Sequence, residues 1–210
     1  MKFKFKLNIV EILSLILVTL IGVSFYLIGT PEYSKDKVVV AFGDSLTVGY
    51  GINPPFKNYV SYLSEKTGIL IINSGKSGDT TADALVRLKE DVLDYNPDVV
   101  MILLGGNDYF RNYSDEVIEV NVRTMIQNIK KSRAKIILIG GSRQVAPHVE
   151  EVAERIVFDG LVDGYVPDVL GGIFLRKDLM YDGAHPNDRG HKIIADRILP
   201  VLESVLSKLN

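Results

Sequence analysis

The sequence predicts an α/β protein built on a parallel sheet with helices on both faces, preceded by an N-terminal membrane helix. Four short apolar runs follow one another along the chain, and helical patterns alternate with them, as in repeated strand–helix units. The membrane helix is predicted because residues 12–29 carry no charge. A chain of 210 residues suffices for one domain with a full core and is short for two. We therefore expect a membrane segment with its linker at 1–36 and one domain at 37–210.

The uncharged run at 12–29 has the length of roughly 18 residues that a membrane-spanning helix requires. Lysines at positions 2, 4 and 6 precede it, which predicts that the amino terminus is inside and the domain extracytoplasmic. A cleaved signal, which would leave the protein secreted, is the alternative. We favour an uncleaved anchor because no alanine occurs before Ala41 and no convincing cleavage site follows the run. Residues 30–36, with Pro31, are interpreted as the linker.

Composition narrows the classes of function. The absence of cysteine excludes disulfides, thiol nucleophiles, zinc–thiolate sites and a lipid attached to cysteine. The formal net charge is −2, and because residues 1–29 carry +2, the remainder of the chain carries −4. With no basic stripe in that remainder, nucleic acid is not an expected partner.

The individual elements follow from apolar spacing. The strands are expected where β-branched apolar residues form short runs, at 38–42, 69–72, 99–104 and 136–139. Helices are expected where apolar residues recur every three to four positions, at 58–65, 81–93, 114–130 and 187–206. Ser114 is placed to cap the third helix, with Asp115 and Glu116 complementing its dipole. Residues 140–179 carry no recognisable motif.

The first apolar run ends in a turn formed by Gly43, Asp44 and Ser45. Open parallel sheets keep their chemistry at the carboxyl ends of the strands. Ser45 can therefore stand with its hydroxyl at the mouth of a cleft, which makes it a candidate nucleophile. The alternative is that Ser45 N-caps the following helix, a common role for serine after a glycine turn.

Two later strand ends also carry glycine and polar groups. The loop after 69–72 contains Gly78, whose backbone N–H can face an anion, although an ordinary turn is the alternative. This loop is not a P-loop, because the first glycine of that motif would fall at Leu70, inside the strand. The run at 99–104 leads into Asn107, which presents an amide at the same edge, although asparagine is also a common turn former.

Near the carboxyl end, Asp182 precedes His185 by three residues in a turn before the last helix. This spacing lets the carboxylate bind one imidazole nitrogen and leaves the other to take a proton from a serine. The alternative is a pair of surface polar groups. His185 is one of three histidines; we expect His191 at the surface of the last helix or half-buried, and His148 in a loop.

Four strand-end loops thus supply a serine, a glycine N–H, an asparagine amide and an Asp-x-x-His pair, which is the inventory that acyl transfer needs. These blocks resemble, in order, the four sequence blocks of the SGNH or GDSL hydrolases. The resemblance covers about residues 38–199. More narrowly, residues 41–51, 77–81 and 182–187 resemble the bacterial branch containing thioesterase I, lysophospholipase and arylesterase.

The resemblance implies a flavodoxin-like three-layer α/β/α domain that hydrolyses carboxylic esters or thioesters through an acyl-serine, with no metal or other cofactor. Carried over by position, it implies Ser45 as nucleophile, His185 as general base and Asp182 as the residue that orients it. The oxyanion hole would consist of the N–H groups of Ser45 and Gly78 and the side-chain amide of Asn107. An extracytoplasmic domain favours a lipid, lysophospholipid or cell-wall ester as substrate.

Aromatic residues flank the motifs and are candidates for the substrate pocket: Tyr50, Tyr109 and Phe110. Packing in the core is their alternative role. Segment 140–179 is also expected to contribute to the pocket. The sequence does not indicate the oligomeric state.

Two other functions compete with the esterase. One is a metal-dependent phosphatase or nuclease with four side chains as ligands: Asp44, Asp108, Asp182 and His185. Against it, the donors of Gly78 and Asn107 suit an oxyanion better than a cation. The other is a non-catalytic, membrane-tethered binding module that keeps the fold without the chemistry.

Overall fold

The computed structural model describes residues 9, 14, 34–53 and 57–209. Apart from Ser14, the predicted membrane helix at 12–29 lies outside the described residues, so the anchor and its orientation stay predictions. Among the described residues, no helix combines the length and the apolar character needed to cross a bilayer.

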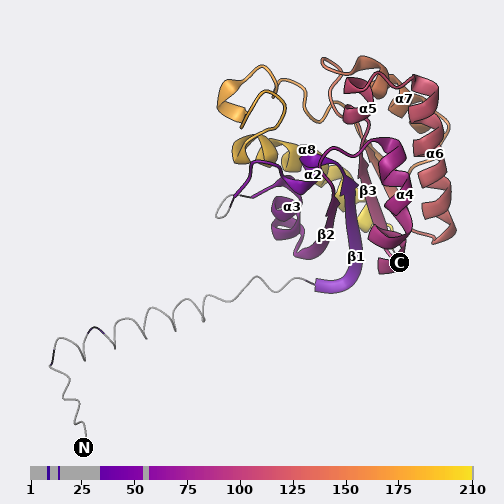
Figure 1. Ribbon diagram of the computed structural model, residues 1–210. Coiled ribbons are helices and arrows are strands. Elements are labelled where there is room, and N and C mark those ends of the chain that lie inside the picture. Colours follow the sequence, from indigo (N-terminus) through magenta and orange to yellow (C-terminus); the bar gives the residue numbers. More distant parts are fainter. Residues whose placement is uncertain (1–8, 10–13, 15–33, 54–56, 210) are drawn as a thin grey trace, which may run out of the picture. The chain divides into compact units, whose positions relative to one another are not determined.

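The centre of the described chain from Ser34 onward is a five-stranded sheet (Figure 1). Its strands are β1 (Ser34–Gly43), β2 (Ile69–Gly75), β3 (Val99–Leu103), β4 (Lys135–Ile139) and β5 (Gly164–Val166). All neighbouring pairs are parallel, in the order β2-β1-β3-β4-β5. This is the flavodoxin-like order, and it leaves a crevice at the carboxyl ends of β1 and β3, where the winding reverses. The predicted α/β fold on a parallel sheet is confirmed.

Side chains of each strand alternate between two cores, as the two-residue repeat of a strand requires. Val39 and Ala41 of β1 belong to the core that contains α3 (Tyr59–Thr67) and α8 (Asp188–Leu206). Val40 and Phe42 belong to the opposite core. That second core contains α4 (Thr81–Asp91), α6 (Asp115–Lys131) and α7 (Pro147–Phe158). Helices therefore cover both faces of the sheet.

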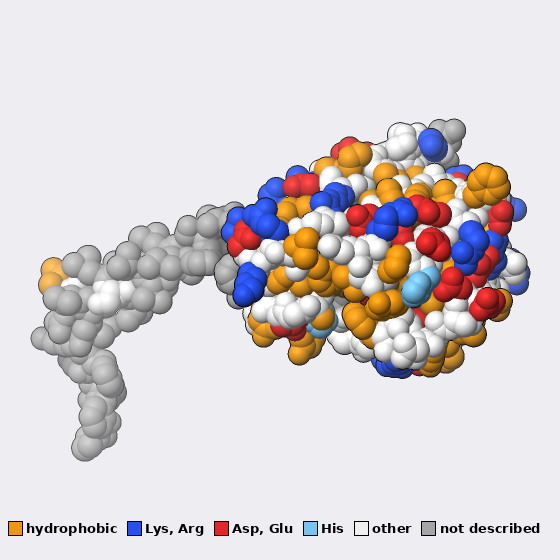
Figure 2. Space-filling view, turned by 90° about the horizontal axis from the view of Figure 1, so that it is seen from above, with side chains coloured by type: hydrophobic (Ala, Val, Ile, Leu, Met, Phe, Trp, Pro, Cys, Tyr) orange, Lys and Arg blue, Asp and Glu red, His pale blue; other side chains and the backbone are white. Residues whose placement is uncertain are grey.

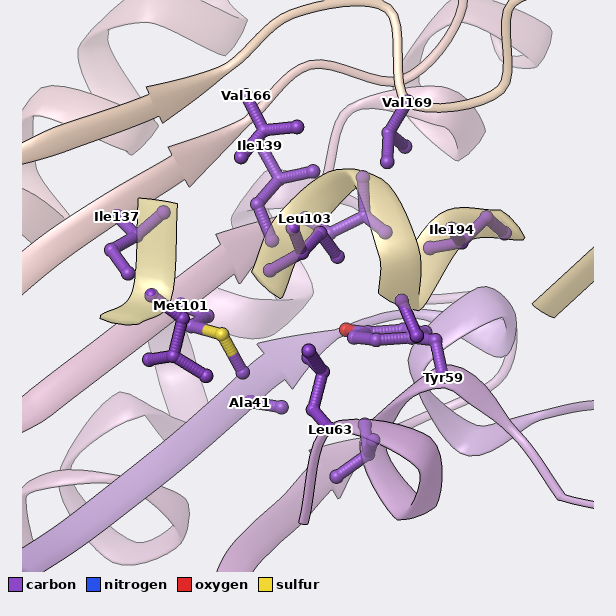
Figure 3. Packing of buried hydrophobic residues seen from close by; sticks show 14 of the residues in the cluster. Ala41, Tyr59, Leu63, Met101, Leu103, Ile137, Ile139, Val166, Val169 and Ile194 are labelled. Carbon is purple, nitrogen blue, oxygen red and sulfur yellow. The ribbon is translucent and has the colours of Figure 1, made fainter. Parts of the chain in front are cut away.

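The core between the sheet and the α3–α8 layer is shown in Figure 3. Tyr59 and Leu63 extend from α3 toward Ala41 and Met101 of the sheet, and Ile194 comes from α8. All five are fully buried. Burying a large apolar side chain contributes about 1.5–3 kcal/mol, so packing holds this layer in place.

Some boundaries differ from those predicted. β1 begins at Ser34, where its backbone pairs with Ile69, so residues 34–36 belong to the sheet and not to a linker. Their charged sequence gives no apolar signal, and backbone pairing does not require one. Ser114 occupies the N-cap position of α6, but its side chain makes no capping hydrogen bond to the backbone. The helix predicted at 81–93 ends at Asp91 and is followed by the 3₁₀ turn η1 (Leu93–Tyr95).

The segment without a motif, residues 140–179, contains α7, β5 and the 3₁₀ turn η2 (Lys177–Leu179). α7 starts with Pro147, and the next residue, His148, lies in this helix and not in a loop. Proline at the first helical position is a start signal, so α7 could have been recognised. β5 is only three residues long and lies at the edge of the sheet, which explains why its sequence carries little strand signal.

Candidate active site

Ser45 is the first residue of the short helix α2 (Ser45–Val48), directly beyond the carboxyl end of β1. Asp44 is the N-cap, because its Oδ1 accepts a hydrogen bond from the Leu46 N–H at 3.0 Å. The alternative reading of Ser45 as a cap is therefore wrong. Gly43 allows the sharp turn, since a Cβ at this position would lie 2.1 Å from Thr47 Oγ1. The turn leaves the Ser45 hydroxyl for another partner.

That partner is His185. Ser45 Oγ lies 3.0 Å from His185 Nε2, across 140 positions of sequence. His185 Nδ1 lies 3.0 Å from both Oδ1 and Oδ2 of Asp182. A carboxylate at Nδ1 favours the tautomer with the proton on that nitrogen, so Nε2 accepts from the serine hydroxyl. The structure thus joins the three predicted catalytic residues in one hydrogen-bonded chain.

The turn that carries Asp182 and His185 is exposed and is held by its own hydrogen bonds. Asp182 Oδ1 accepts from the N–H groups of Ala184 and His185, both at 2.7 Å. The Tyr181 N–H donates to the His185 carbonyl at 2.8 Å. The Ala184 N–H, and after it the His185 side chain, hold the pKa of Asp182 below its ordinary value. The carboxylate is therefore ionised at neutral pH.

Asn107 reaches the same site from the end of β3. It lies in α5 (Gly106–Phe110), just beyond β3, and lines one cavity together with Ser45. Its Nδ2 donates to the Asp79 carbonyl at 2.9 Å and to Asp44 Oδ2 at 3.3 Å. A side-chain amide has two N–H donors, so both are engaged in this structure.

Gly78, the other predicted oxyanion donor, lies in the loop after β2 and is not among the residues that line this cavity. Its carbonyl accepts from Arg111 Nη2 at 2.9 Å. The structure therefore brings Ser45, His185 and Asn107 to one cavity and leaves Gly78 beside it.

Asp44 is a buried carboxylate at the floor of the site, with 5% of its surface exposed. Burial, which disfavours the charged form, raises the pKa of Asp44 to about 6, against the opposing effect of the Leu46 N–H. Most of this carboxyl is consequently ionised at pH 7, where it acts as a hydrogen-bond acceptor for Asn107.

Arg87 of α4 cross-links the loops around Ser45, and the sequence did not single it out. It donates to the carbonyls of Gly43 and Ser74, both at 2.9 Å, and to Asp79 Oδ2 at 2.5 Å. Its side chain is only 10% exposed. Arg87 thereby ties the nucleophile turn to the loop whose Asp79 carbonyl holds Asn107. The sequence could have indicated a buried arginine here, because Arg87 lies between Ala84 and Leu88 on the apolar side of a predicted helix.

The side chains of the metal alternative do not converge. The Asp108 carboxylate is fully buried and accepts from the Thr81 N–H at 2.9 Å and from Thr81 Oγ1 at 2.5 Å. Within the part of the chain that the structure describes, no three His, Asp or Glu side chains are grouped as metal ligands. Asp108 is instead a structural link between α5 and α4.

An apolar cavity of about 170 Å³ opens beside Ser45. Its walls come from the end of β3, from α5, from the start of α7 and from the loops at 141–146 and 170–174. Phe110 lines it, as predicted for this residue. Figure 2 looks onto the carboxyl ends of the strands and shows hydrophobic side chains interspersed among charged ones on this face.

The other two predicted pocket aromatics do not line this cavity. Tyr109 packs against Phe110 and His148, with ring centroids 5.5 and 5.4 Å apart. Adjacent residues on a helix point about 100° apart, and the ring of Tyr109 is directed toward His148 and not into the cavity that Phe110 lines. The Tyr50 ring lies against the His185 ring, with centroids 4.5 Å apart, and is half exposed.

His191 is fully buried, contrary to the expectation of a surface or half-buried residue. Its Nδ1 accepts from the Tyr59 N–H at 3.4 Å, and its Nε2 has no hydrogen-bond partner within the described residues. Burial lowers the pKa of His191 to about 4, so it is neutral at pH 7. The Tyr59 hydroxyl in turn lies 2.8 Å from Thr47 Oγ1 of α2. His191 is therefore part of the packing beneath the nucleophile helix.

Comparison with known proteins assigns this constellation to a family. Residues 41–193 match the sequence profile of the GDSL-like lipase/acylhydrolase family. The chain belongs to this family. The matched span includes the hydrogen-bonded chain from Ser45 to Asp182 and the Asn107 amide.

Two relatives of this GDSL hydrolase carry the names of ester or thioester hydrolases. An arylesterase of Vibrio mimicus is 33% identical over 200 residues, which covers 89% of this chain and 94% of the relative. Thioesterase 1/protease 1/lysophospholipase L1 of Escherichia coli strain K12 is 26% identical over 178 residues, covering 80% of this chain and 85% of that protein. The predicted identity as an SGNH-type hydrolase acting on ester bonds is confirmed.

Solved structures show the same fold. The psychrotrophic esterase EstA from Pseudoalteromonas sp. superposes with a TM-score of 0.74 at 24% identity, over 82% of this GDSL hydrolase and 100% of that chain. A crystal structure of TesA gives the same TM-score and identity over 80% of this chain and 99% of that one.

Proposed function

We propose that this GDSL hydrolase cleaves a carboxylic ester or thioester with an apolar acyl group of short to medium length. Ser45 is the nucleophile, His185 the general base and Asp182 the residue that orients it. The observation that carries the proposal is the 3.0 Å contact between Ser45 Oγ and His185 Nε2 at the mouth of an apolar cavity. At about 170 Å³ the cavity is smaller than the roughly 300–1,000 Å³ of pockets for drug-sized ligands, which favours a limited acyl length.

Acylation begins with the Ser45 hydroxyl, which is a weak nucleophile until a base removes its proton. His185 Nε2 takes this proton as Ser45 Oγ bonds to the substrate carbonyl carbon, and the Asp182 carboxylate stabilises the resulting imidazolium. The bond from that carbon to the leaving oxygen or sulfur then breaks, and His185 protonates the leaving group. An acyl ester on Ser45 remains.

Deacylation repeats these steps with water. His185 removes a proton from a water molecule, whose oxygen bonds to the acyl carbon. The bond to Ser45 Oγ breaks, Ser45 regains a proton from His185, and the carboxylic acid is released.

In this proposal, three hydrogen-bond donors stabilise the negative charge that develops on the carbonyl oxygen. They are the N–H groups of Ser45 and Gly78 and the side-chain Nδ2 of Asn107. What supports Asn107 is its position in the same cavity as Ser45. Of its two hydrogen bonds, the one to Asp44 is longer, at 3.3 Å, and is the one to be redirected to the oxyanion. A donor of this kind lowers the barrier by about 2.7–4 kcal/mol.

The proposed location is extracytoplasmic, with the domain tethered by the helix predicted at 12–29. The support is the uncharged run and the three lysines before it. In that location a lipid or cell-wall ester is the proposed substrate, and the relatives named arylesterase and lysophospholipase are consistent with an ester. Cell fractionation followed by immunoblotting separates an anchored protein from a secreted one.

The test of the catalytic proposal is Ser45→Ala, assayed with p-nitrophenyl butyrate and with a fluorescent fluorophosphonate, which labels activated serines. We expect loss of both turnover and labelling, with an unchanged circular dichroism spectrum. Ser142→Ala is the matched control, because Ser142 lines the same cavity but its Oγ, within the part of the chain that the structure describes, accepts from the Val145 N–H and contacts no histidine. The control should label like the wild type.

Undiminished turnover by Ser45→Ala would remove Ser45 from the mechanism. A wild-type protein that neither labels nor hydrolyses any ester would instead support the binding-module alternative.

A further inference from the structure

A second, smaller cavity lies behind the one at Ser45. It has a volume of about 20 Å³ and lies between β4, α6 and α7, where Ile118, Val122 and Val152 contribute to an apolar lining. Three residues line both cavities: Leu104, Gly141 and Val149. The two spaces are therefore separated by a single layer of residues.

Val149 is the part of this shared wall that comes from α7, and it is buried. Gly141 contributes no side chain, and Leu104 continues from the end of β3. Val149 sits against Gly105, since a Cβ built on that glycine would lie 2.6 Å from Val149 Cγ1. Gly105 also has φ +110°, in the left-handed region that favours glycine. The close contact leaves no opening between Val149 and the turn before Asn107.

We infer that Val149 sets the maximum acyl-chain length of this enzyme by closing the passage from the first cavity to the second. The inference rests on the proposed function, in which the acyl group attached to Ser45 Oγ extends into the first cavity. An acyl chain long enough to reach Val149 meets its two methyl groups and can go no further.

The size of the inner cavity sets the size of the effect. A cavity of about 20 Å³ holds roughly one water-sized group. Deletion of the two Val149 methyl groups adds to it, so the joined space accommodates about two more methylenes. Each buried methylene increases binding by about fourfold.

The experiment is a chain-length profile of kcat/KM for Val149→Ala on p-nitrophenyl esters from acetate to dodecanoate, with each value divided by that for acetate. We expect the optimum to move about two carbons longer, with a relative gain of about 15-fold for the ester two carbons beyond the wild-type optimum. Val149→Ile, which adds a methylene, should shorten the optimum by about one carbon. Thermal unfolding confirms that each variant is folded.

Val152→Ala is the matched control. Val152 is a buried valine on the same helix that lines only the inner cavity, so its truncation enlarges that space without opening the wall. We expect it to keep the wild-type profile.

An unchanged relative profile in Val149→Ala, or the same shift in Val152→Ala, would overturn the inference. So would an equal loss for every ester, which would show that Val149 only supports the Gly105 turn. If Val149→Ala does not fold, the profile of Val149→Ile decides. Failure of the proposed function is distinguishable, because it would appear as hydrolysis by Ser45→Ala whatever the profile of the Val149 variants.

Discussion

The nucleophile side and the base side of this site are held by different forces. On the nucleophile side, the buried Arg87 bonds to the Gly43 carbonyl and to Asp79, so helix α4 fixes the loops after β1 and β2. On the base side, Asp182 and His185 lie in an exposed turn that is closed mainly by its own hydrogen bonds. Substitutions on the base side should therefore lower catalysis with little effect on stability, whereas substitutions on the nucleophile side should lower both.

The largest expected effect comes from Asp182→Asn. The amide keeps an oxygen for the backbone N–H groups of Ala184 and His185, but it favours the wrong imidazole tautomer, so kcat should fall by about 10⁴. Because the side chain is exposed, the free energy of unfolding should change by less than about 0.5 kcal/mol. Steady-state kinetics and urea unfolding measure the two quantities. A large loss of stability in Asp182→Asn would contradict the proposed difference between the two sides of the site.

Arg87→Ala should show the opposite behaviour. It leaves Asp79 buried without its cation and frees two loop carbonyls, so the free energy of unfolding should fall by about 3–5 kcal/mol. We also expect kcat to fall, because the turn before Ser45 loses its tie to the Asp79 loop. Urea unfolding and kinetics at a temperature where the variant is folded test this.

The control for that prediction is Arg111→Ala. Arg111 is half exposed and donates to the Gly78 carbonyl, so its removal should cost less than about 1 kcal/mol. Equal losses of stability for the two arginine variants would contradict the assigned role of Arg87.

A smaller effect should appear in the pH dependence of stability. The folded-state pKa of His191, about 4, lies below the ordinary value of 6.5, so the unfolded chain binds more protons between these values. Stability from the neutral imidazole is fully present above about pH 6.5 and is lost as the pH falls toward 4, by about 3 kcal/mol.

Asp44 changes the pH dependence of stability in the opposite direction, since its pKa is raised from 3.8 to about 6. Its contribution is fully present below about pH 4 and is lost as the pH rises through 6. His191→Gln removes the first trend and keeps the second, so stability measured by urea unfolding should decline from pH 4 to 6.5 relative to the wild type. Parallel curves for the two proteins would show that His191 does not titrate as its burial implies.

The positions of Ser45 and Asn107 were predictable because each lies just beyond the end of a strand, β1 or β3. Asp182 and His185 follow no strand directly, and the Asp-x-x-His spacing before the last helix is what predicted them. Parallel strands place their carboxyl ends at one edge of a sheet, so polar residues after successive apolar runs meet without further information. The burial of His191 could also have been predicted. It continues the buried helical spacing of Ile194, Ala195 and Ile198, which marks it as a core position.

Other parts of the site could not be predicted because they depend on tertiary packing. Arg87 acts through carbonyl groups 13 and 44 positions away, and a carbonyl has no sequence signature. The cavity wall joins α5, α7 and a loop near Leu170, which come together only once the sheet is assembled. Phe110 and Tyr109 are adjacent and both aromatic, and only the phase of α5 decides which one lines the cavity.

In the resting enzyme, the Asp44 carboxylate accepts from the same Asn107 amide that the substrate carbonyl oxygen would otherwise contact. An uncharged ester carbonyl is a weaker acceptor than an ionised carboxylate and will not displace it, whereas a tetrahedral oxyanion carries comparable charge. On the proposed mechanism, the amide therefore changes partner only as the carbonyl oxygen acquires charge. Because the hydrogen bond to Asp44 is given up in this exchange, the net contribution of Asn107 to turnover is the difference between its hydrogen bond to the oxyanion and the one it leaves.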